Sequence, residues 1–302
     1  MMSKDGGEAS QWRIDYAREL AQFYITHPQI KMIVLGGSPS RGLSDQYSDL
    51  DIVVYWDKMD HEWLELIPLR DTAAERKLMR KMGESDIYLE QYYFGNLKAD
   101  FGHVTLDFWQ EMCDDVLQKF DTDSGKQKSI AGFMEAVPLH GENLIAEWKK
   151  RLSSYPDQLA YNMVKQNLSL FVHGCLLRQG YERGDLIFYY DGLCLMLKKL
   201  LAILAGLNRM YFSKDEPRWI EFELEQMVLK PDQMWQRILK IFRSPPAESD
   251  YQLNKLVDEV LDLVAEHMPD VSVIVKERIR EFEVKPCPEK PPIHEFPRPH
   301  RD

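Results

Sequence analysis

Two aspartates separated by a single residue, Asp49 and Asp51, are the side chains of this sequence whose type and spacing most suggest chemistry. They open an apolar run, and if that run is a strand, both carboxylates point to the same face. Two such carboxylates repel each other unless a cation lies between them. Upstream, Gly36, Gly37 and Ser38 form a turn that a phosphate can approach closely, because two of its residues have no Cβ atom. Mg²⁺ takes carboxylate oxygens together with substrate phosphates, so the pattern predicts nucleotide chemistry.

Two apolar segments must position these residues. Residues 33–35 run into the glycine turn, and residues 52–55 follow the aspartates, so the sequence predicts a strand, a polar loop and a second strand. Arg41 lies within the loop and has two interpretations, a phosphate contact or a partner in a structural ion pair.

Gly37-Ser38, ten further residues and then Asp49-x-Asp51 resemble the signature of the DNA polymerase β-type nucleotidyltransferase superfamily. The resemblance implies that the glycine turn holds the β- and γ-phosphates of a nucleoside triphosphate, with Arg41 beside it. It also implies that the two aspartates bind Mg²⁺, two ions when nucleotide is bound, and that a third carboxylate on a neighbouring strand completes the site. Arg41 and its following glycine resemble a Ser-Arg-Gly variant common among bacterial members.

The third carboxylate is predicted to be Asp107. Residues 86–95 and 103–109 are rich in aromatic and β-branched residues and are predicted as strands, with a turn region over residues 96–102. Asp107 is embedded among apolar residues of the second strand, as the resemblance requires, and its implied role is metal ligand and general base. Glu90 is the alternative, since it also lies in a predicted strand.

Each of these features has an ordinary explanation when taken alone. Aspartates often precede strands, paired glycines most often form simple turns, and Asp107 could merely end a strand. The catalytic interpretation is preferred because all three features occur together within one short α/β segment.

Composition limits the function classes. The chain has 302 residues, 44% of them hydrophobic, which is enough for two domains with substantial cores. Its formal net charge of −11 argues against a long nucleic acid as partner. The four cysteines lack metal-site spacing, and no signal peptide or membrane-spanning segment is predicted, so we expect a cytoplasmic protein without a membrane partner.

The predicted fold class is α+β, a nucleotidyltransferase-type mixed sheet with flanking helices followed by an α-helical bundle. A charged helical segment is expected over residues 63–82. The domains are predicted as residues 1–145 for the nucleotidyltransferase part, 146–284 for the bundle and 285–302 for a proline-rich, disordered tail. The oligomeric state is not predicted.

This order of domains resembles the bacterial aminoglycoside and lincosamide nucleotidyltransferases, in which the bundle contributes a basic residue to the triphosphate. Arg218, in the pair Arg218-Trp219, is the favoured candidate. Asp185 and Tyr189 could contact an acceptor, although a helix cap and a packing tyrosine are the preferred interpretation. The other cationic candidates are Lys165, Lys199 and Lys214.

The predicted reaction is Mg²⁺-dependent transfer of a nucleoside monophosphate to a hydroxyl of a small molecule, with release of pyrophosphate. The favoured case is transfer of AMP from ATP. An antibiotic is one acceptor that the resemblance suggests. Two alternatives stay open: an AMP-transferase that modifies another protein, as in toxin–antitoxin systems, and a nucleotide-binding interaction module without turnover.

Overall fold

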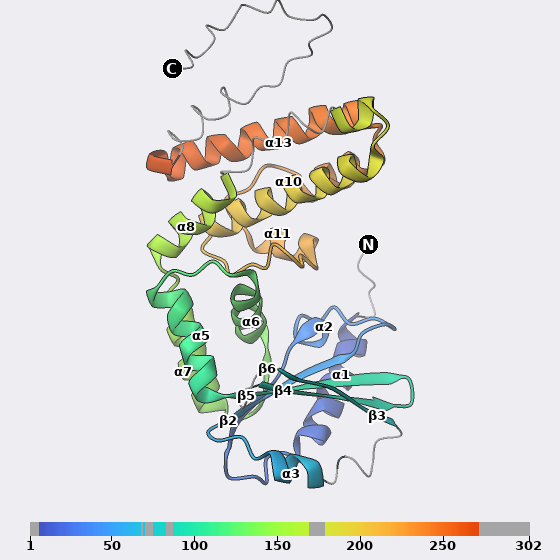
Figure 1. Ribbon diagram of the computed structural model, residues 1–302, viewed down its shortest axis with the longest axis vertical. Helices are drawn as coiled ribbons and strands as arrows, with labels where there is room; N and C mark the ends of the chain where they lie inside the picture. The colour runs from blue at the N-terminus through green and yellow to red at the C-terminus, as the bar shows by residue number, and fades with distance from the viewer. Residues whose placement is uncertain (1–5, 68, 70–74, 83–86, 169–178, 272–302) are drawn as a thin grey trace, which may run out of the picture. The chain divides into compact units, whose positions relative to one another are not determined.

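The computed structural model describes residues 6–67, 69, 75–82, 87–168 and 179–271 (Figure 1). The predicted proline-rich tail, residues 285–302, lies outside the described residues. The chain divides into two compact units, residues 1–165 with 201–229 and residues 166–200 with 230–302, which are described separately below as the first and the second unit. This division differs from the predicted boundary at residue 145, because residues 146–165 and 201–229 belong to the first unit.

A six-stranded mixed sheet is the centre of the first unit, with the strand order β3-β4-β5-β2-β1-β6. The β2 and β5 strands pair in parallel, and the other neighbouring strands are antiparallel. This mixed sheet with flanking helices confirms the predicted α+β class. The strands are β1 (Ile30–Leu35), β2 (Leu50–Trp56), β3 (Glu75–Met82), β4 (Ile87–Phe94), β5 (Leu97–Thr105) and β6 (Val137–His140).

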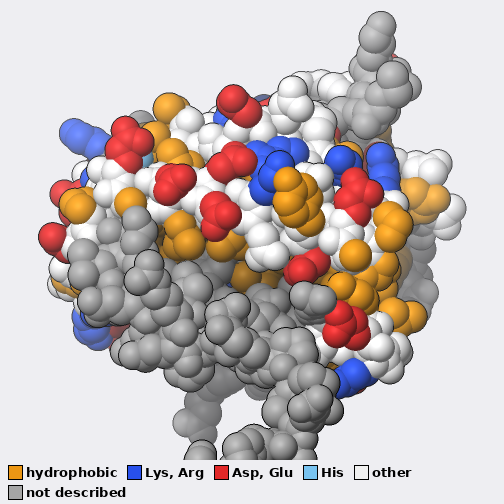
Figure 2. Space-filling view, turned by 90° about the horizontal axis from the view of Figure 1, so that it is seen from above, with side chains coloured by type: hydrophobic (Ala, Val, Ile, Leu, Met, Phe, Trp, Pro, Cys, Tyr) orange, Lys and Arg blue, Asp and Glu red, His pale blue; other side chains and the backbone are white. Residues whose placement is uncertain are grey.

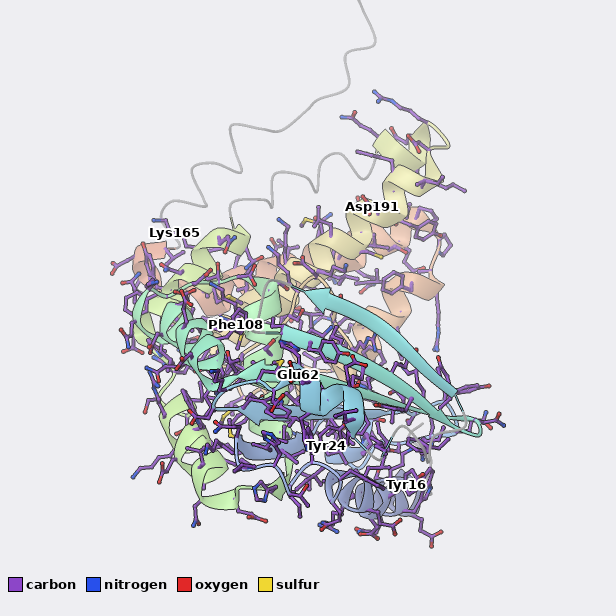
Figure 3. All side chains as sticks on the ribbon, turned by 60° about the horizontal axis from the view of Figure 1, so that its bottom comes forward. Tyr16, Tyr24, Glu62, Phe108, Lys165 and Asp191 are labelled. Atoms are coloured by element: carbon purple, nitrogen blue, oxygen red, sulfur yellow. The ribbon has the colours of Figure 1, made fainter. Side chains whose placement is uncertain are left out.

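One face of the sheet packs against helix α1 (Gly6–Ala21) and forms the main core. Tyr24, just after α1, is fully buried and stacks on Phe101 of β5 with a ring-centroid distance of 5.0 Å (Figure 3). From Leu50 to Val54 of β2, buried side chains alternate with more exposed ones, as expected for a strand with one face toward the core. Asp51 therefore belongs to the opposite face.

The opposite face is covered at one end by helices α5 (Leu106–Gln118), α6 (Ser124–Glu135) and α7 (Glu142–Leu152) (Figure 1). Tyr55 of β2 makes edge-to-face contacts there with Trp109 and Phe133, at ring-centroid distances of 5.3 and 5.7 Å. Aromatic pairs in this geometry are favourable beyond the area they bury. These contacts hold the C-terminal end of β2 against the helices. The N-terminal end of β2, with Asp51, is not covered by these three helices.

The expected helix over residues 63–82 is wrong in its second half. Helix α3 spans His61–Leu66 and is capped by Asp60, whose carboxylate accepts a hydrogen bond of 2.9 Å from the Trp63 N–H. Residues 75–82 form strand β3 instead, which pairs along its length with β4. Pairing with the neighbouring strand decides the structure here, although the charged composition suited a helix.

The remaining elements are helical. In the first unit lie α2 (Gly37–Ser40), most of α8 (Asp157–Leu168), the end of α10 (Leu186–Leu207) and α11 (Ile220–Gln226). In the second unit, the start of α10 lies beside α13 (Pro246–His267) (Figure 1), and the Tyr189 hydroxyl donates to the Pro246 carbonyl at 3.2 Å. Helix α12 (Met234–Arg243) is tied to α13 by the Arg237–Glu259 ion pair.

The charged side chains coloured in Figure 2 are of both signs and are interspersed with apolar ones on that face of the molecule. Among the described helices, none combines the length and the hydrophobicity needed to cross a bilayer.

Candidate functional site

Three carboxylates converge at the uncovered end of β2. Asp49, Asp51 and Asp100 each offer an oxygen, and the three oxygens lie within 4.8 Å of one another. Asp51 and Asp100 are direct neighbours in the parallel β2–β5 pair, so both side chains point to the same face of the sheet. Asp49 immediately precedes β2 and joins them from the loop. The predicted pair of aspartates therefore lies together, with Asp100 as the third acid.

Asp107 does not lie in this cluster, and the strand predicted over residues 103–109 is wrong from residue 106 onward. The β5 strand ends at Thr105, whose hydroxyl accepts a hydrogen bond of 3.3 Å from the Phe108 N–H and so caps α5. Asp107 is in the first turn of that helix. Asp100 and Thr105 are five strand residues apart, about 17 Å, so Asp107 lies at the opposite end of β5 from Asp51.

Glu90, the alternative third acid, is buried on the core face of the sheet. Its carboxylate accepts hydrogen bonds of 3.2 Å from the hydroxyls of Tyr24 and Tyr92 and lies 3.2 Å from Nε2 of His103. These contacts satisfy a carboxylate that is 1% exposed. Glu90 therefore stabilises the core and faces away from Asp51.

Lys98 of β5 bridges two of the three carboxylates. Its Nζ lies 2.6 Å from Oδ2 of Asp49 and 2.8 Å from Oδ2 of Asp100. Partial burial lowers the pKa of Lys98, but its hydrogen bonds to Asp100 and Asp49 and their charges together raise it above the ordinary value. Gln91 of β4 donates to the other oxygen of Asp100 at 2.7 Å, and the Tyr93 hydroxyl in turn donates to Gln91 at 3.0 Å. Asp100 is therefore held in one orientation.

Asp51 has an electrostatically unfavourable position. The pKa of its carboxyl is raised to about 6, chiefly because the group loses hydration on the pocket wall. The negative charges of Asp49 and Asp100 raise this pKa further, and the positive charges of Lys98 and Arg218 lower it. The side chain still keeps contact with solvent on its open side. Groups with such shifts that lie in a pocket are typical of functional sites.

The Gly36–Ser38 turn packs directly against this carboxylate. The Gly36 N–H donates a hydrogen bond of 2.8 Å to the Asp51 carbonyl, and this bond joins the turn to β2. Gly37 has a φ of +69°, and a Cβ atom at this position would lie 2.4 Å from Oδ2 of Asp51. The backbone conformation therefore favours glycine here, and a larger residue would also force the Asp51 carboxylate to move. Ser38 lines the same pocket and is nearly buried, with its Oγ 3.5 Å from that of Ser44.

The loop that carries Asp49 is tied to α1 through a buried arginine. Arg13 is 5% exposed and donates to the carbonyls of Ser48 at 3.1 Å, Asp45 at 2.8 Å and Ala9 at 3.0 Å. Burial lowers the pKa of Arg13, while the charges of Asp45 and Asp49 oppose the shift. Because a guanidinium stays protonated in proteins, it holds the loop as a permanent cation.

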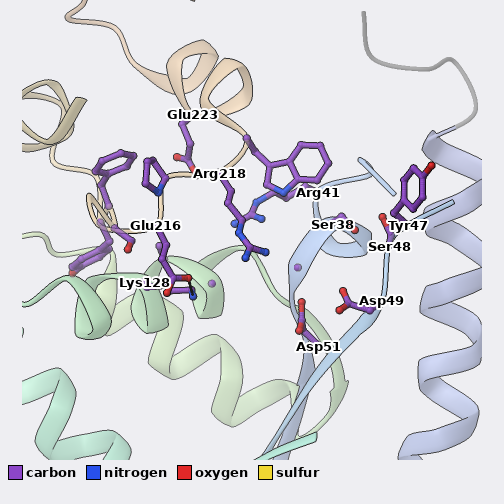
Figure 4. A pocket seen from close by; sticks show the side chains of 18 of the residues that line it. Ser38, Arg41, Tyr47, Ser48, Asp49, Asp51, Lys128, Glu216, Arg218 and Glu223 are labelled. Carbon is purple, nitrogen blue, oxygen red and sulfur yellow. Dashed lines mark hydrogen bonds and ion pairs between the residues drawn. The ribbon is translucent and has the colours of Figure 1, made fainter. Parts of the chain in front are cut away.

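Asp49 and Asp51 line one side of a pocket of about 470 Å³ within the first unit (Figure 4). Arg218 lies on another side and points toward Asp51, close enough that its charge lowers the pKa of that carboxyl. Lys128 and Glu216 form an ion pair of 2.5 Å at the pocket wall. The other lining residues include Tyr47, Ser48, Tyr211, Phe212, Ser213 and Trp219.

Arg41 lines this pocket as an ion-pair partner. Its guanidinium contacts Glu135 of α6 at 2.5 Å, and its Nε is buried without a hydrogen-bond partner. Glu223 of α11 faces the same pair, and its burial and the charge of Glu135 raise its pKa to about 7, against the charge of Arg41. The structural alternative for Arg41, a partner in an ion pair, is thus present.

The other cationic candidates lie outside the lining of the pocket. Lys165 stacks over the ring of Tyr161 at 5.4 Å, Lys199 is 2% exposed on the part of α10 in the second unit, and Lys214 is absent from the pocket lining. In the second unit, Asp185 accepts from the Phe188 N–H at 3.3 Å and Tyr189 is 1% exposed. The preferred interpretation of a helix cap and a packing tyrosine matches these contacts.

The residues present fit a divalent cation. Three carboxylates converge, loss of hydration and then the charges of Asp49 and Asp100 raise the pKa of Asp51, and a lysine ammonium bridges two of the three acids. An all-oxygen donor set of this kind suits Mg²⁺, Mn²⁺ or Ca²⁺ better than softer metals. The most acidic end of the sheet thus attracts a cation by its own chemistry.

Sequence reasoning missed Asp100, Lys98 and Glu223. The first two had a usable signal: Gly95-Asn96 is a typical two-residue hairpin turn, and the apolar residues Ala99 and Phe101 alternate with them. Glu223 had no local signal, because the fold alone brings α11 to the pocket.

The match to a protein-family model agrees with this site. Residues 17–110 match the family model of the nucleotidyltransferase domain, which spans the glycine turn and all three carboxylates of the cluster. A nucleotidyltransferase-like protein from Exiguobacterium sibiricum 255-15 aligns structurally over 89% of this chain and 86% of its own, with 12% sequence identity and a TM-score of 0.41. No curated protein sequence matches the chain significantly. Residues 17–110 therefore belong to the nucleotidyltransferase domain family, and the chain is an enzyme of the nucleotidyltransferase type.

Proposed function

We propose that the chain transfers a nucleoside monophosphate from a nucleoside triphosphate to a hydroxyl group of a small molecule, with release of pyrophosphate. ATP is the favoured donor. The observation that carries this proposal is the convergence of Asp49, Asp51 and Asp100 beside the Gly37-Ser38 turn, where Asp49 and Asp51 line a pocket that has Arg218 on another wall. The pocket is large enough for part of a nucleotide and a small acceptor, as ligand pockets commonly are.

In this proposal the acceptor oxygen attacks the α-phosphorus, the new O–P bond forms, and the bond to the pyrophosphate oxygen breaks. Asp100 takes the proton of the acceptor hydroxyl, in place of Asp107, and Gln91 keeps its carboxylate oriented. The Gly36–Ser38 turn and Arg218 bind the phosphates and hold the leaving pyrophosphate. Positioning and charge neutralisation supply most of the rate acceleration in phosphoryl and nucleotidyl transfer.

A divalent cation would be held by Asp49, Asp51 and Asp100, and Mg²⁺ is the proposed ion. When bound, it would neutralise phosphate charge and stabilise the charge that develops on the reacting oxygens. The chain's own contribution is to keep the three carboxylates together through the β2–β5 register and the loop anchored by Arg13.

The test is a transfer assay with each of ATP, CTP, GTP and UTP, Mg²⁺ and a panel of hydroxyl-bearing small molecules that includes aminoglycosides and lincosamides. Pyrophosphate release and the mass of the acceptor are measured for the wild type and for the Asp49→Asn/Asp51→Asn variant. We expect one acceptor to gain the mass of a nucleoside monophosphate with the wild type and none with the variant.

Other outcomes would favour the alternatives. A polypeptide that gains the mass of AMP, while no small molecule does, would favour protein modification. Nucleotide binding that persists in Asp100→Asn, with no pyrophosphate released by the wild type on any acceptor, would favour a binding module without turnover.

A further inference from the structure

Lys98 occupies the position in which a metal ion would contact the catalytic carboxylates. Its Nζ lies 2.6 Å from Asp49 Oδ2 and 2.8 Å from Asp100 Oδ2. Both residues belong to the group of three whose oxygens lie within 4.8 Å of one another. An ammonium and a divalent ion bind carboxylate oxygens along the same lone pairs, and a metal requires them at about 2.1 Å. The two cations therefore compete for the same two oxygens.

The position of Lys98 is set by the sheet and is unlike that of a mobile surface lysine. Lys98 and Asp100 are two residues apart on β5, so both side chains point to the face that carries Asp51. Gln91 donates to the other oxygen of Asp100, which leaves Oδ2 toward Lys98. About one third of the Lys98 side chain is exposed, so its ammonium has room to move toward solvent.

We propose that Lys98 is an internal countercation of the metal-free site, which neutralises Asp49 and Asp100 and is displaced by the divalent ion that binds with the nucleotide. This inference rests on the proposed metal-dependent function and adds a residue that sets the affinity for the ion. In the empty site, three carboxylates without Lys98 would repel one another with no charge bound between them. The lysine thus stabilises the unloaded site and weakens the binding of metal.

The test is Mn²⁺ binding to the nucleotide-free protein, measured by calorimetry or by the electron paramagnetic resonance signal of the free ion. Lys98→Met is compared with the wild type, and Lys128→Met is the matched control, because Lys128 lines the pocket that Asp49 and Asp51 also line but pairs with Glu216. We expect Lys98→Met to bind Mn²⁺ about fivefold or more tightly, since a competing unit charge at ion-pair distance is removed. Lys128→Met should stay within about twofold of the wild type, because screening weakens charges that are farther away.

Two further measurements keep the test independent of a folding defect. Lys98→Arg keeps the cation and should bind Mn²⁺ no more tightly than the wild type, while Lys98→Met should melt at a lower temperature than the wild type without metal. A crystal structure of the Mn²⁺-loaded wild type should have the ion between Asp49 and Asp100, with Lys98 Nζ moved out of hydrogen-bond distance of both.

Mn²⁺ binding that is equal or weaker in Lys98→Met, or a loaded structure in which Lys98 still contacts both carboxylates, would overturn the displacement and leave the proposed function intact. No Mn²⁺ binding by the wild type or by Lys98→Met, although both are folded, would overturn the metal-dependent function itself and this inference with it.

Discussion

Asp51 connects the charge balance of the site with the stability of the protein. Its ordinary pKa of 3.8 applies to the unfolded chain, whereas partial desolvation and the neighbouring acids raise the pKa to about 6 in the metal-free folded protein. Between these two values the folded state binds more protons than the unfolded state, so stability falls as pH rises from about 4 to about 6. Above that window the ionised Asp51 destabilises the metal-free protein.

We therefore predict that Asp51→Asn, which cannot ionise, melts at a higher temperature than the wild type at pH 7 without metal, and at nearly the same temperature at pH 4. Thermal unfolding in the presence of a chelator measures both values. Asp258→Asn, at an exposed position of α13, is the control and should change neither. A lower melting temperature for Asp51→Asn at pH 7 would contradict the account of the charge balance.

Gly37 and Gly42 allow a matched comparison that tests the close approach of the glycine turn to Asp51. Both have a positive φ, but a Cβ atom at Gly37 would lie 2.4 Å from Asp51 Oδ2, whereas one at Gly42 meets nothing within 4 Å. Gly42→Ala should cost only the backbone strain, about 1 kcal/mol in the free energy of unfolding. Gly37→Ala should cost somewhat more, about 1–3 kcal/mol, because the end of the Asp51 side chain must also move away from the new methyl group.

Chemical denaturation measures both costs, and nucleotide titration measures the function of the turn. Because the added methyl group must push the Asp51 carboxylate aside, Gly37→Ala should also lose most of its nucleotide affinity while Gly42→Ala keeps it. Equal affinities in the two folded variants would show that the contact between Gly37 and Asp51 has no role in binding.

At the scale of elements, the strands explain which parts of the site the sequence could predict. The β1–turn–β2 segment was predictable because apolar runs, glycines and paired acids are local signals. The family model covers the same segment. The third acid was not found, because residues 96–102 resemble a turn and the apolar residues around Asp107 resemble a strand. Pairing with β2 and β4 makes 97–105 a strand, and the Thr105 cap starts a helix before Asp107.

One side chain, Asn208, joins the two ends of the segment that carries Arg218 and Glu223. Asn208, at the end of α10, donates to the Leu229 carbonyl at 2.8 Å and accepts from the N–H groups of Val228 and Leu229, both at 2.8 Å. These bonds close residues 209–227 into a loop that starts and ends at the same place.

We predict that Asn208→Ala lowers the free energy of unfolding by about 1–3 kcal/mol, since backbone groups lose their partners. Its nucleotide affinity should fall as well, because Arg218 is no longer held beside Asp51. Arg218→Gln is the comparison: it should weaken nucleotide binding at unchanged stability. A destabilised Asn208→Ala with full affinity would mean that the loop closure does not position Arg218.

At the scale of the whole molecule, the charge bears on the class of partner. The net charge is −11, and charges of both signs are interspersed on the face in Figure 2. Nucleic-acid binding draws most of its affinity from cations that neutralise phosphates. We predict no binding of duplex DNA or of structured RNA at physiological salt in fluorescence anisotropy. Saturable binding that strengthens steeply at low salt would argue for a nucleic-acid acceptor instead.

Local sequence patterns predicted the domain organisation only in outline. The change from mixed α/β to helical composition was visible in the sequence, but residues 201–229 belong to the unit that contains the sheet. That assignment is decided by contacts between distant residues, such as the Tyr211 hydroxyl with the Leu152 carbonyl at 2.8 Å. Arg218 was predicted from the resemblance alone as the basic residue that contacts the triphosphate. That role stays a prediction.

The central claim is that Asp49, Asp51 and Asp100 together hold the metal and the nucleotide, and that Asp107 does not. Calorimetric titration of ATP, CTP, GTP and UTP with Mg²⁺ into the wild type, Asp49→Asn/Asp51→Asn, Asp100→Asn and Asp107→Asn tests it most directly. The account predicts metal-dependent binding of at least one nucleotide that is retained in Asp107→Asn and lost in the other two variants. Binding that survives in Asp100→Asn but is lost in Asp107→Asn would contradict it.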